Sequence, residues 1–275
     1  MKKELNFLSF GSGSSGNCYY FYTAQGGLLI DAGLGVRMLK KYFNQYGVSL
    51  SKINAILVTH DHVDHARQVG ALSKDAFLPV YATAAVNRGI MANHCLRKKI
   101  PAANWREITV GEGFDVGDMH ITPFAVPHDS YDCVGFRIAC GSRVLVLATD
   151  VGHITPQIAQ QIADADYLVL ESNYDKEMLL NGRYPAHLKT RIMSPVGHLS
   201  NDECGQIIAQ MASEKLQQVW LCHLSEENNT PYMAIETVQN HIKGAGRFQE
   251  GKPEVQALNR RLPTGAFCLD MGEEE

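Results

Sequence analysis

The chain has 275 residues, of which 45% are hydrophobic, and this is enough to bury one substantial core. Its formal net charge of −4 argues against a protein that coats nucleic acid through bulk positive charge, so a polyanionic substrate must be attracted locally. The longest apolar runs, such as Val144 to Ala148 and Tyr167 to Leu170, are far shorter than the roughly 20 residues that cross a bilayer. We expect a single catalytic domain over residues 1–275 in the cytoplasm, since the N-terminal segment lacks an apolar signal region.

Short apolar runs dominate the first half of the chain and predict strands. They lie near residues 5–10, 18–23, 27–31, 54–58, 119–126, 133–139 and 143–148, with Gly-rich turns at 11–16 and 111–117. Two further strands are expected near 166–171 and 217–222.

Helical patterns lie near residues 35–46, 64–74, 83–93, 155–163, 202–213 and 230–243. The last of these opens with Thr230-Pro231, a capping residue followed by a first-turn proline. Because each half of the chain supplies both strands and helices, the order fits an α/β fold with four αββα layers. The pattern alone also allows other α/β layouts.

The cysteines form an odd set with wide spacing and no C-x-x-C pair. This pattern indicates neither a disulfide framework nor a zinc ribbon. We expect all seven to be reduced, small core residues: Cys18, Cys95, Cys133, Cys140, Cys204, Cys222 and Cys268.

The strongest chemical signal follows the strand predicted at 54–58. It runs directly into Thr59-His60-Asp61-His62-Val63-Asp64-His65, which places three imidazoles and two carboxylates within six residues. In an extended segment His60 and His62 can point to the same side, while Asp64 and His65, at the start of the next helix, turn towards a neighbouring point. Since imidazole and carboxylate suit zinc and its neighbours, the block predicts two adjacent metal ions.

This block resembles the H-x-H-x-D-H signature of the metallo-β-lactamase superfamily, in which His, Asp and His ligands follow downstream. Matching residues occur in that order at the ends of predicted strands, namely His128, Asp150 and His223. The resemblance implies one ion on His60, His62 and His128, a second ion on Asp64, His65 and His223, and a bridging Asp150. It also implies a hydrolase, with Asp64 counted among the catalytic residues and zinc, manganese or iron as the two ions.

Two later motifs narrow the reaction. Glu171-Ser172-Asn173-Tyr174-Asp175 ends a predicted strand and Gly197-His198-Leu199-Ser200 opens a helix. They resemble the paired Glu and Gly-His motifs of phosphodiesterase members such as RNase Z. The resemblance implies that Glu171 orients His198, which contributes to phosphodiester cleavage without binding metal. The alternative is a helix-capping region with an incidental histidine.

With Gly11-Ser12-Gly13-Ser14-Ser15-Gly16-Asn17-Cys18 and His223-Leu224-Ser225, these motifs resemble the YycJ/WalJ family of single-domain nucleases from end to end. The resemblance implies a nucleic-acid substrate, DNA in preference to RNA, and 5′-to-3′ exonuclease activity. Residues 151–197 are too few for the β-CASP insertion of RNase J-like nucleases. Three alternatives stay open: an RNase Z-like RNA-processing nuclease, a small-molecule phosphodiesterase or esterase, and a non-catalytic metal-binding regulator.

Two segments suit contact with a phosphate backbone. One is the Ser/Gly turn, with Ser12, Ser14 and Asn17 as candidate donors, and the other is a basic loop that carries Lys189 and Arg191 before His198. Each has a plainer interpretation, as a hairpin turn and as solvated charge. Of the other histidines, His153 and His187 could line the cleft, and the clusters at 97–99 and 260–261 are expected to be ordinary surface charge.

Overall fold

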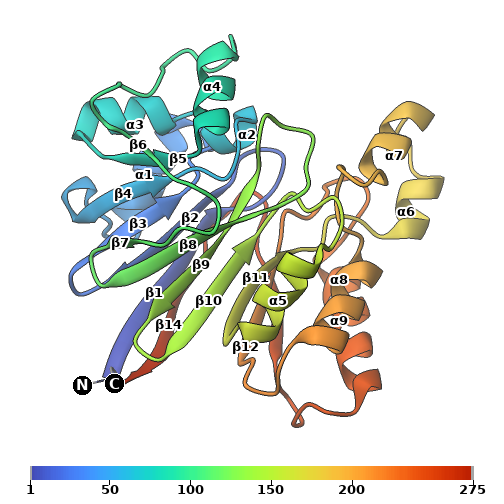
Figure 1. Ribbon diagram of the computed structural model, residues 1–275. Helices are drawn as coiled ribbons and strands as arrows, with labels where there is room; N and C mark the ends of the chain where they lie inside the picture. The colour runs from blue at the N-terminus through green and yellow to red at the C-terminus, as the bar shows by residue number, and fades with distance from the viewer. Residues whose placement is uncertain (1, 274–275) are drawn as a thin grey trace.

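Two seven-stranded sheets form the inner layers of the protein, whose computed structural model describes residues 2–273 (Figure 1). The first sheet contains, in spatial order, β14 (Thr264–Glu273), β1 (Lys2–Gly11), β2 (Cys18–Thr23), β3 (Gly26–Ile30), β4 (Ile53–Leu57), β5 (Val80–Ala82) and β6 (Trp105–Glu107). The second contains β13 (Glu254–Ala257), β12 (Gln218–Cys222), β11 (Tyr167–Glu171), β10 (Arg143–Ala148), β9 (Val134–Cys140), β8 (Met119–Ala125) and β7 (Phe114–Val116). In each sheet four neighbouring strands run parallel, β3 to β6 and β10 to β13.

Helices form the two outer layers. The first sheet is covered by α1 (Val36–Gln45), α3 (Val69–Ala76) and α4 (Ala84–Ala92), and the second by α5 (Pro156–Asp164), α8 (Asn201–Met211) and α9 (Pro231–Ala245). This arrangement confirms the expected αββα layers. None of the helices in the described part of the chain is both long and apolar enough to cross a bilayer.

The strands alternate between two cores, because successive side chains of a strand point to opposite faces of its sheet. Phe7 packs between the two sheets, with its ring centroid 5.0 Å from that of Trp220. The next residue, Leu8, packs under the helices of the first sheet, and Leu221 does the same in the second. The predicted strand pattern is therefore explained by a core on both faces of each sheet.

Polar caps fix where several helices begin. The side chain of Thr230, the residue before Pro231, accepts a hydrogen bond from the backbone amide of Met233. The helix start predicted from Thr230-Pro231 is therefore confirmed. Ser200 and Glu203 form a reciprocal capping box at the start of α8, immediately after His198. Such caps stabilise a helix by about 1 kcal/mol each and here fix the chain beside the candidate site.

Several elements differ from the prediction. The helix expected at 64–74 is two helices, α2 (Val63–Ala66) and α3, since the backbone amide of Gln68 bonds to the carbonyl of Ala32 instead of continuing the first helix. The basic segment before His198 is helical rather than a loop, with α6 (Lys176–Asn181) and α7 (Ala186–Ile192). The strands β5, β6, β7, β13 and β14 were not predicted, and β7 lies inside the expected turn at 111–117.

The cysteines were predicted correctly only in part. All seven are free thiols and five are buried, but Cys95 and Cys268 are exposed. Cys268 lies on β14, whose side chains alternate between a buried and a solvent-facing side.

Candidate metal and catalytic site

The carboxyl ends of the parallel strands in both sheets meet at one edge of the sandwich, and the candidate residues follow these strands. Asp31 follows β3, Asp150 lies two residues beyond β10, and His223 follows β12. Their φ angles are 61°, 56° and 53°, in the left-handed region that non-glycine residues rarely adopt. Such backbone costs of order 1–3 kcal/mol per residue and persists where surrounding contacts enforce it, typically at functional sites.

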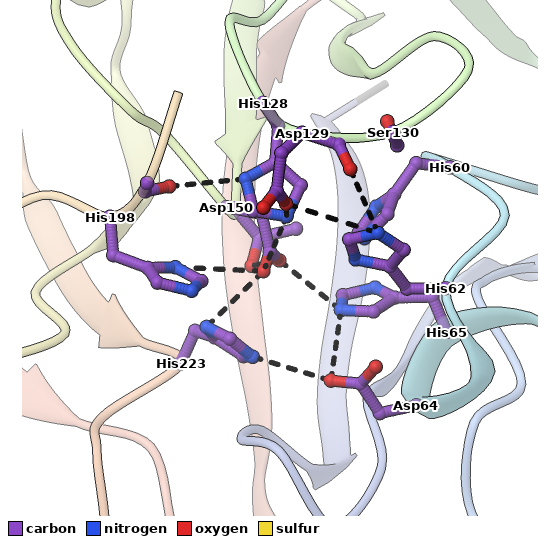
Figure 2. Close-up of polar contacts among 12 residues, drawn as sticks. His60, His62, Asp64, His65, His128, Asp129, Ser130, Asp150, His198 and His223 are labelled. Atoms are coloured by element: carbon purple, nitrogen blue, oxygen red, sulfur yellow. Dashed lines mark hydrogen bonds and ion pairs between the residues drawn. The ribbon is translucent and has the colours of Figure 1, made fainter. Parts of the chain in front are cut away.

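The first group of side chains contains His60, His62 and His128, whose candidate ligand atoms all lie within 4.8 Å of one another (Figure 2). Nε2 of His62 donates to the carbonyl of Asp129 at 3.2 Å, and Nδ1 of His128 donates to the carbonyl of Gly197 at 3.1 Å. These bonds fix the protonated nitrogen of each ring, because a carbonyl can only accept. The opposite nitrogens, Nδ1 of His62 and Nε2 of His128, are left to bind a cation.

The second group contains Asp64, His65 and His223, also within 4.8 Å of one another. Nε2 of His65 and Nε2 of His223 each lie 3.6 Å from Oδ2 of Asp64. Nδ1 of His65 is held by Oδ2 of Asp31 at 2.7 Å, so the Nε2 side of this ring faces the group.

Asp150 lies between the two groups. Its Oδ2 is 3.1 Å from Nε2 of His65, while its Oδ1 is 3.7 Å from Nε2 of His128 and 3.4 Å from Nδ1 of His223. Thr149 donates its hydroxyl to Oδ2 at 2.8 Å. The structure thus brings together all seven residues of the predicted ligand set, with Asp150 between the two groups.

Burial and charge set opposite protonation states within this cluster. Burial, with help from neighbouring His65, lowers the pKa of His60 well below its ordinary value, so this ring stays neutral, the form that binds metal. Burial works against ionisation of Asp150, but His223 and His65 hold the pKa of its carboxyl well below the usual range. Burial likewise opposes protonation of His223, but Asp150, Asp64 and Glu171 raise its pKa to about 10.

The donor set fits two divalent cations. Nε2 of His60 and Nε2 of His223 are both buried without a hydrogen-bond partner among residues 2–273, which is costly for an imidazole nitrogen unless a ligand completes it. A three-histidine group and an Asp-His-His group around a shared carboxylate supply borderline nitrogen and oxygen donors, which suit zinc, manganese and iron.

Glu171, the last residue of β11, is fully buried beside the cluster. Its Oε1 accepts from Nδ1 of His198 at 2.8 Å and from Nδ1 of His223 at 2.9 Å. Its Oε2 accepts from the backbone amides of Val151 at 2.6 Å and Leu199 at 3.1 Å. Burial would raise the pKa of Glu171, but His198 lowers it, so the group stays ionised. The contact with His198 matches the expected pair, and the contact with His223 was not predicted.

Asp31 is a residue of the site that the sequence analysis missed. Its carboxylate accepts from the backbone amide of Thr59 at 2.9 Å, from the hydroxyl of Thr59 at 2.8 Å and from Nδ1 of His65 at 2.7 Å. It therefore fixes the orientation of His65 and the start of the histidine block. The available signal was an Asp directly after the apolar strand predicted near 27–31.

Two of the candidate donors in the Ser/Gly turn face inward, which corrects the prediction for Ser12 and Asn17. The hydroxyl of Ser12 is buried, accepts from the backbone amide of His223 at 2.8 Å and lies 2.9 Å from the hydroxyl of Tyr19. The side-chain amide of Asn17 is buried 2.8 Å from Nε2 of His65. Ser14 is exposed and lines the cleft, so it alone of the three is available to a substrate.

The two basic candidates also differ from each other. Nζ of Lys189 donates to the carbonyl of Leu180 at 2.6 Å and ties α7 to α6, so a role in substrate binding is not supported. Arg191 lines the cleft and donates two hydrogen bonds, of 2.6 and 3.0 Å, to the carboxylate of Asp129. Neither His153 nor His187 lines this cleft.

A cleft of about 250 Å³ opens over the cluster. One wall is α7 and the residues around it, and the other is formed by the Ser/Gly turn, the start of α2 and the residues after β12. Its lining is Ser14, His62, Asp64, His128, Asp150, Asn173, Tyr184, Leu188, Arg191, Ile192, His198, His223 and Ser225.

Comparison with known proteins agrees with this architecture. A model of the beta-lactamase superfamily domain matches residues 27–224. Exodeoxyribonuclease YycJ of Bacillus anthracis is 33% identical over 261 residues, which cover 94% of this chain and 97% of the relative. Exodeoxyribonuclease WalJ of Streptococcus pneumoniae is 32% identical over 234 residues, 85% of this chain and 87% of the relative.

Among solved structures, the metallo-beta-lactamase fold protein YhfI from Bacillus subtilis superposes with a TM-score of 0.68 at 19% identity, over 95% of this chain and 99% of that one. Its likeness supports the fold. The chain therefore belongs to the beta-lactamase superfamily and is similar in sequence to the YycJ and WalJ proteins.

Proposed function

We propose that the protein is a metal-dependent hydrolase that cleaves phosphodiester bonds of nucleic acid, and that it acts as a 5′-to-3′ DNA exonuclease in the cytoplasm. Relatives named exodeoxyribonuclease match almost the whole chain. The observation that carries the proposal is the pair of buried Glu171 and partly exposed His198 beside the seven-residue cluster. The other residues of the site suit metal ions, and this pair supplies in addition a group that can transfer a proton.

In this proposal His60, His62 and His128 would hold one divalent ion, Asp64, His65 and His223 would hold the other, and Asp150, which lies between the two groups, would serve both. Bound there, the two ions supply Lewis acidity for a phosphoryl oxygen and a nucleophilic water at neutral pH. The Thr149 hydroxyl and the Asp31 carboxylate hold Asp150 and His65 in place for this purpose.

His198 is the proposed proton donor. Its Nδ1 is held by Glu171, and the side chain, 15% exposed, lines the cleft, so Nε2 is the atom left for the substrate. In the protonated form it can deliver a proton from Nε2 to the departing oxygen, a contribution of typically about 10²–10⁴-fold to rate. Ser14 and Arg191 are two groups of the cleft that can donate to substrate phosphates.

The small cleft supports a second candidate, a phosphodiesterase for small molecules. A volume of about 250 Å³ is below the range of roughly 300–1,000 Å³ that is typical of ligand pockets, so the cleft itself holds only a short part of a substrate. The end of an unpaired strand and a small phosphodiester could both fit in this volume. The two candidates differ only in what extends beyond the cleft.

A nuclease assay with metal analysis tests the proposal. Single-stranded and duplex DNA and RNA, labelled at either end, are incubated with protein loaded with zinc or manganese, and bound metal is measured by mass spectrometry. We expect stepwise loss of nucleotides from DNA and about two ions per chain. Hydrolysis of bis-p-nitrophenyl phosphate without degradation of any strand would select the second candidate, and a protein without hydrolytic activity at two ions per chain would overturn both.

A further inference from the structure

Two consecutive residues of the Ser/Gly turn face different cavities. Ser14 lines the metal cleft, and Ser15 lines a neighbouring cavity of about 650 Å³. The second cavity has an apolar floor of Leu34, Val36 and Met38, and the side chain of Met38 is 41% exposed. The turn is thus a shared rim between the candidate site and an apolar cavity.

The wall between the two cavities is thin. The backbone amide of Asn17 bonds to the carbonyl of Asp64 at 2.7 Å, and the amide of Gly33 bonds to the carbonyl of Asn17 at 2.9 Å. A Cβ on Gly33 would collide with the carbonyl oxygen of Asp64, so the segment that leads from β3 into Leu34 runs directly against the backbone of a candidate ligand. The cavity therefore lies immediately behind the segment that carries Asp64.

The opposite side of the metal cleft is closed by α7, which contributes Leu188 and Ile192. Tyr184, shortly before α7, lines the same side. In Figure 1, α6 and α7 lie on the other side of the molecule from α1, which begins at the apolar cavity. A strand whose phosphate lies at the cluster can leave past Ser14, and this path leads to the second cavity.

The chemistry of the second cavity fits an unpaired nucleobase. Its apolar floor suits the face of a base, and the side-chain amide of Gln68 can bond to the polar edge. Arg37 and Arg261 are exposed at the lining, where guanidinium groups can stack on a base or pair with the flanking phosphates. Arg261 also bonds to Glu226 at 2.6 Å on the surface, whereas Arg37 forms no ion pair within residues 2–273.

We propose that this cavity binds an unpaired base of the substrate strand, within a few nucleotides of the scissile phosphate. The proposal rests on the proposed nuclease function and names the feature that distinguishes a strand from a small phosphodiester. It makes Val36 and Met38 binding residues that act on affinity and leave the chemistry at the cluster unchanged.

The test combines variants of the cavity with changes in the strand. Val36→Ser and Met38→Ser, separately and together, are compared with Met91→Ser, an exposed methionine on α4 that does not line the cavity. Each protein receives single-stranded DNA with normal bases and strands with one abasic position among the first four. We expect the double variant to raise KM on normal DNA about tenfold with unchanged kcat, and Met91→Ser to change neither.

One abasic position should raise KM of the wild-type protein by a similar factor. It should raise KM of the double variant little further, since both changes remove the same contact. The inference would be overturned if the double variant raised KM, relative to the wild-type protein, by the same factor on normal and abasic strands at every position. It would also be overturned if the double variant left KM unchanged. That last result would favour a partner protein as the occupant. These outcomes need a wild-type protein that degrades DNA, so failure of the nuclease function itself is recognised separately by the absence of wild-type cleavage.

A binding measurement gives a readout apart from turnover. A strand with 2-aminopurine at the sensitive position and phosphorothioate linkages that resist hydrolysis is titrated with metal-loaded protein. We expect a fluorescence change on wild-type and Met91→Ser protein and about tenfold weaker binding to the double variant. Unchanged fluorescence on saturation with the wild-type protein would show that the base stays in solvent and would overturn the inference.

Discussion

Oε1 of Glu171 accepts a hydrogen bond from Nδ1 of His223 at 2.9 Å, and the same oxygen accepts from Nδ1 of His198 at 2.8 Å. One buried carboxylate therefore orients both a proposed metal ligand and the proposed proton donor. It is itself fixed by the backbone amides of Val151 and Leu199, which bond to its other oxygen. In the proposed function, Glu171 therefore couples metal binding to proton transfer.

We predict that Glu171→Gln lowers both turnover and metal affinity, each by about 10- to 100-fold, the range typical of residues that orient metal ligands. A glutamine has only one accepting oxygen, so it cannot serve two histidines and two backbone amides together. Turnover is measured beside metal content across a titration with zinc buffer. Full metal affinity with reduced turnover would show that the bond to His223 is dispensable and that Glu171 acts on His198 alone.

Asp150→Ala should abolish activity and lower the metal content from about two ions towards one or none. The carboxylate of Asp150 is the group that lies between both candidate sites, 3.1 Å from His65 and 3.7 Å from His128. Metal analysis after gel filtration measures the content, and Asp61→Ala is the matched control. Asp61 belongs to the same motif, but its carboxylate bonds to the backbone of Tyr131 and lies outside the groups that could hold an ion. Two tightly bound ions in Asp150→Ala would contradict the assignment.

The residues that converge on the site were largely predictable because their types and their places at strand ends are both visible in the sequence. The order of the histidine block, His128, Asp150 and His223 suffices to propose a ligand set, and parallel strands then bring the ends together. The assignment of each ligand to an ion stays a prediction. The four layers were predictable for a related reason, since strands buried on both faces need helices outside them.

What the sequence did not reveal depends on contacts across the fold. Ser12 and Asn17 were expected to face a substrate because their polar side chains lie on a Gly-rich turn, yet both are buried against His223 and His65. The bond between Glu171 and His223 exists because β11 and β12 are neighbours, with Glu171 opposite Cys222 in the register. The segments α6 and α7 have six and seven residues and flank Pro185, so neither is long enough to show a helical period.

The Ser/Gly turn offers a prediction that separates substrate contact from structure. Ser14→Ala should raise KM for a strand with a 5′-phosphate several-fold and leave thermal stability unchanged, because Ser14 is exposed at the cleft. Ser12→Ala should instead lower the stability of the fold by about 1 kcal/mol, because it removes the buried partner of the His223 amide. Thermal unfolding and rates on 5′-phosphate and 5′-hydroxyl strands measure the two effects. If Ser14→Ala has the KM of the wild-type protein on both 5′-phosphate and 5′-hydroxyl strands, the hydroxyl of Ser14 does not contact the terminal phosphate.

The histidine pair around Glu171 gives the sharpest separation of roles. We predict that His198→Ala retains two ions and loses turnover by about 10²–10⁴-fold, whereas His223→Ala releases one ion and loses activity for that reason. The physical reason is the direction of the free nitrogens. Nε2 of His223 is buried, without a hydrogen-bond partner among the residues described, and lies 3.6 Å from Asp64, while His198 is partly exposed in the cleft and bonds to Glu171.

Metal content measured beside turnover distinguishes the two histidines, and a substrate with a good leaving group refines the result. A p-nitrophenolate leaving group departs without a proton, so His198→Ala should lose less activity on bis-p-nitrophenyl phosphate than on DNA if His198 protonates the departing oxygen. His223→Ala should lose activity on both substrates alike, because the missing ion serves both. Equal losses of His198→Ala on the two substrates, with both ions bound, would show that His198 stabilises charge in the transition state instead of delivering the proton. Loss of an ion from His198→Ala would instead place His198 among the metal ligands, and the Glu171–His198 pair would then no longer support a phosphodiesterase.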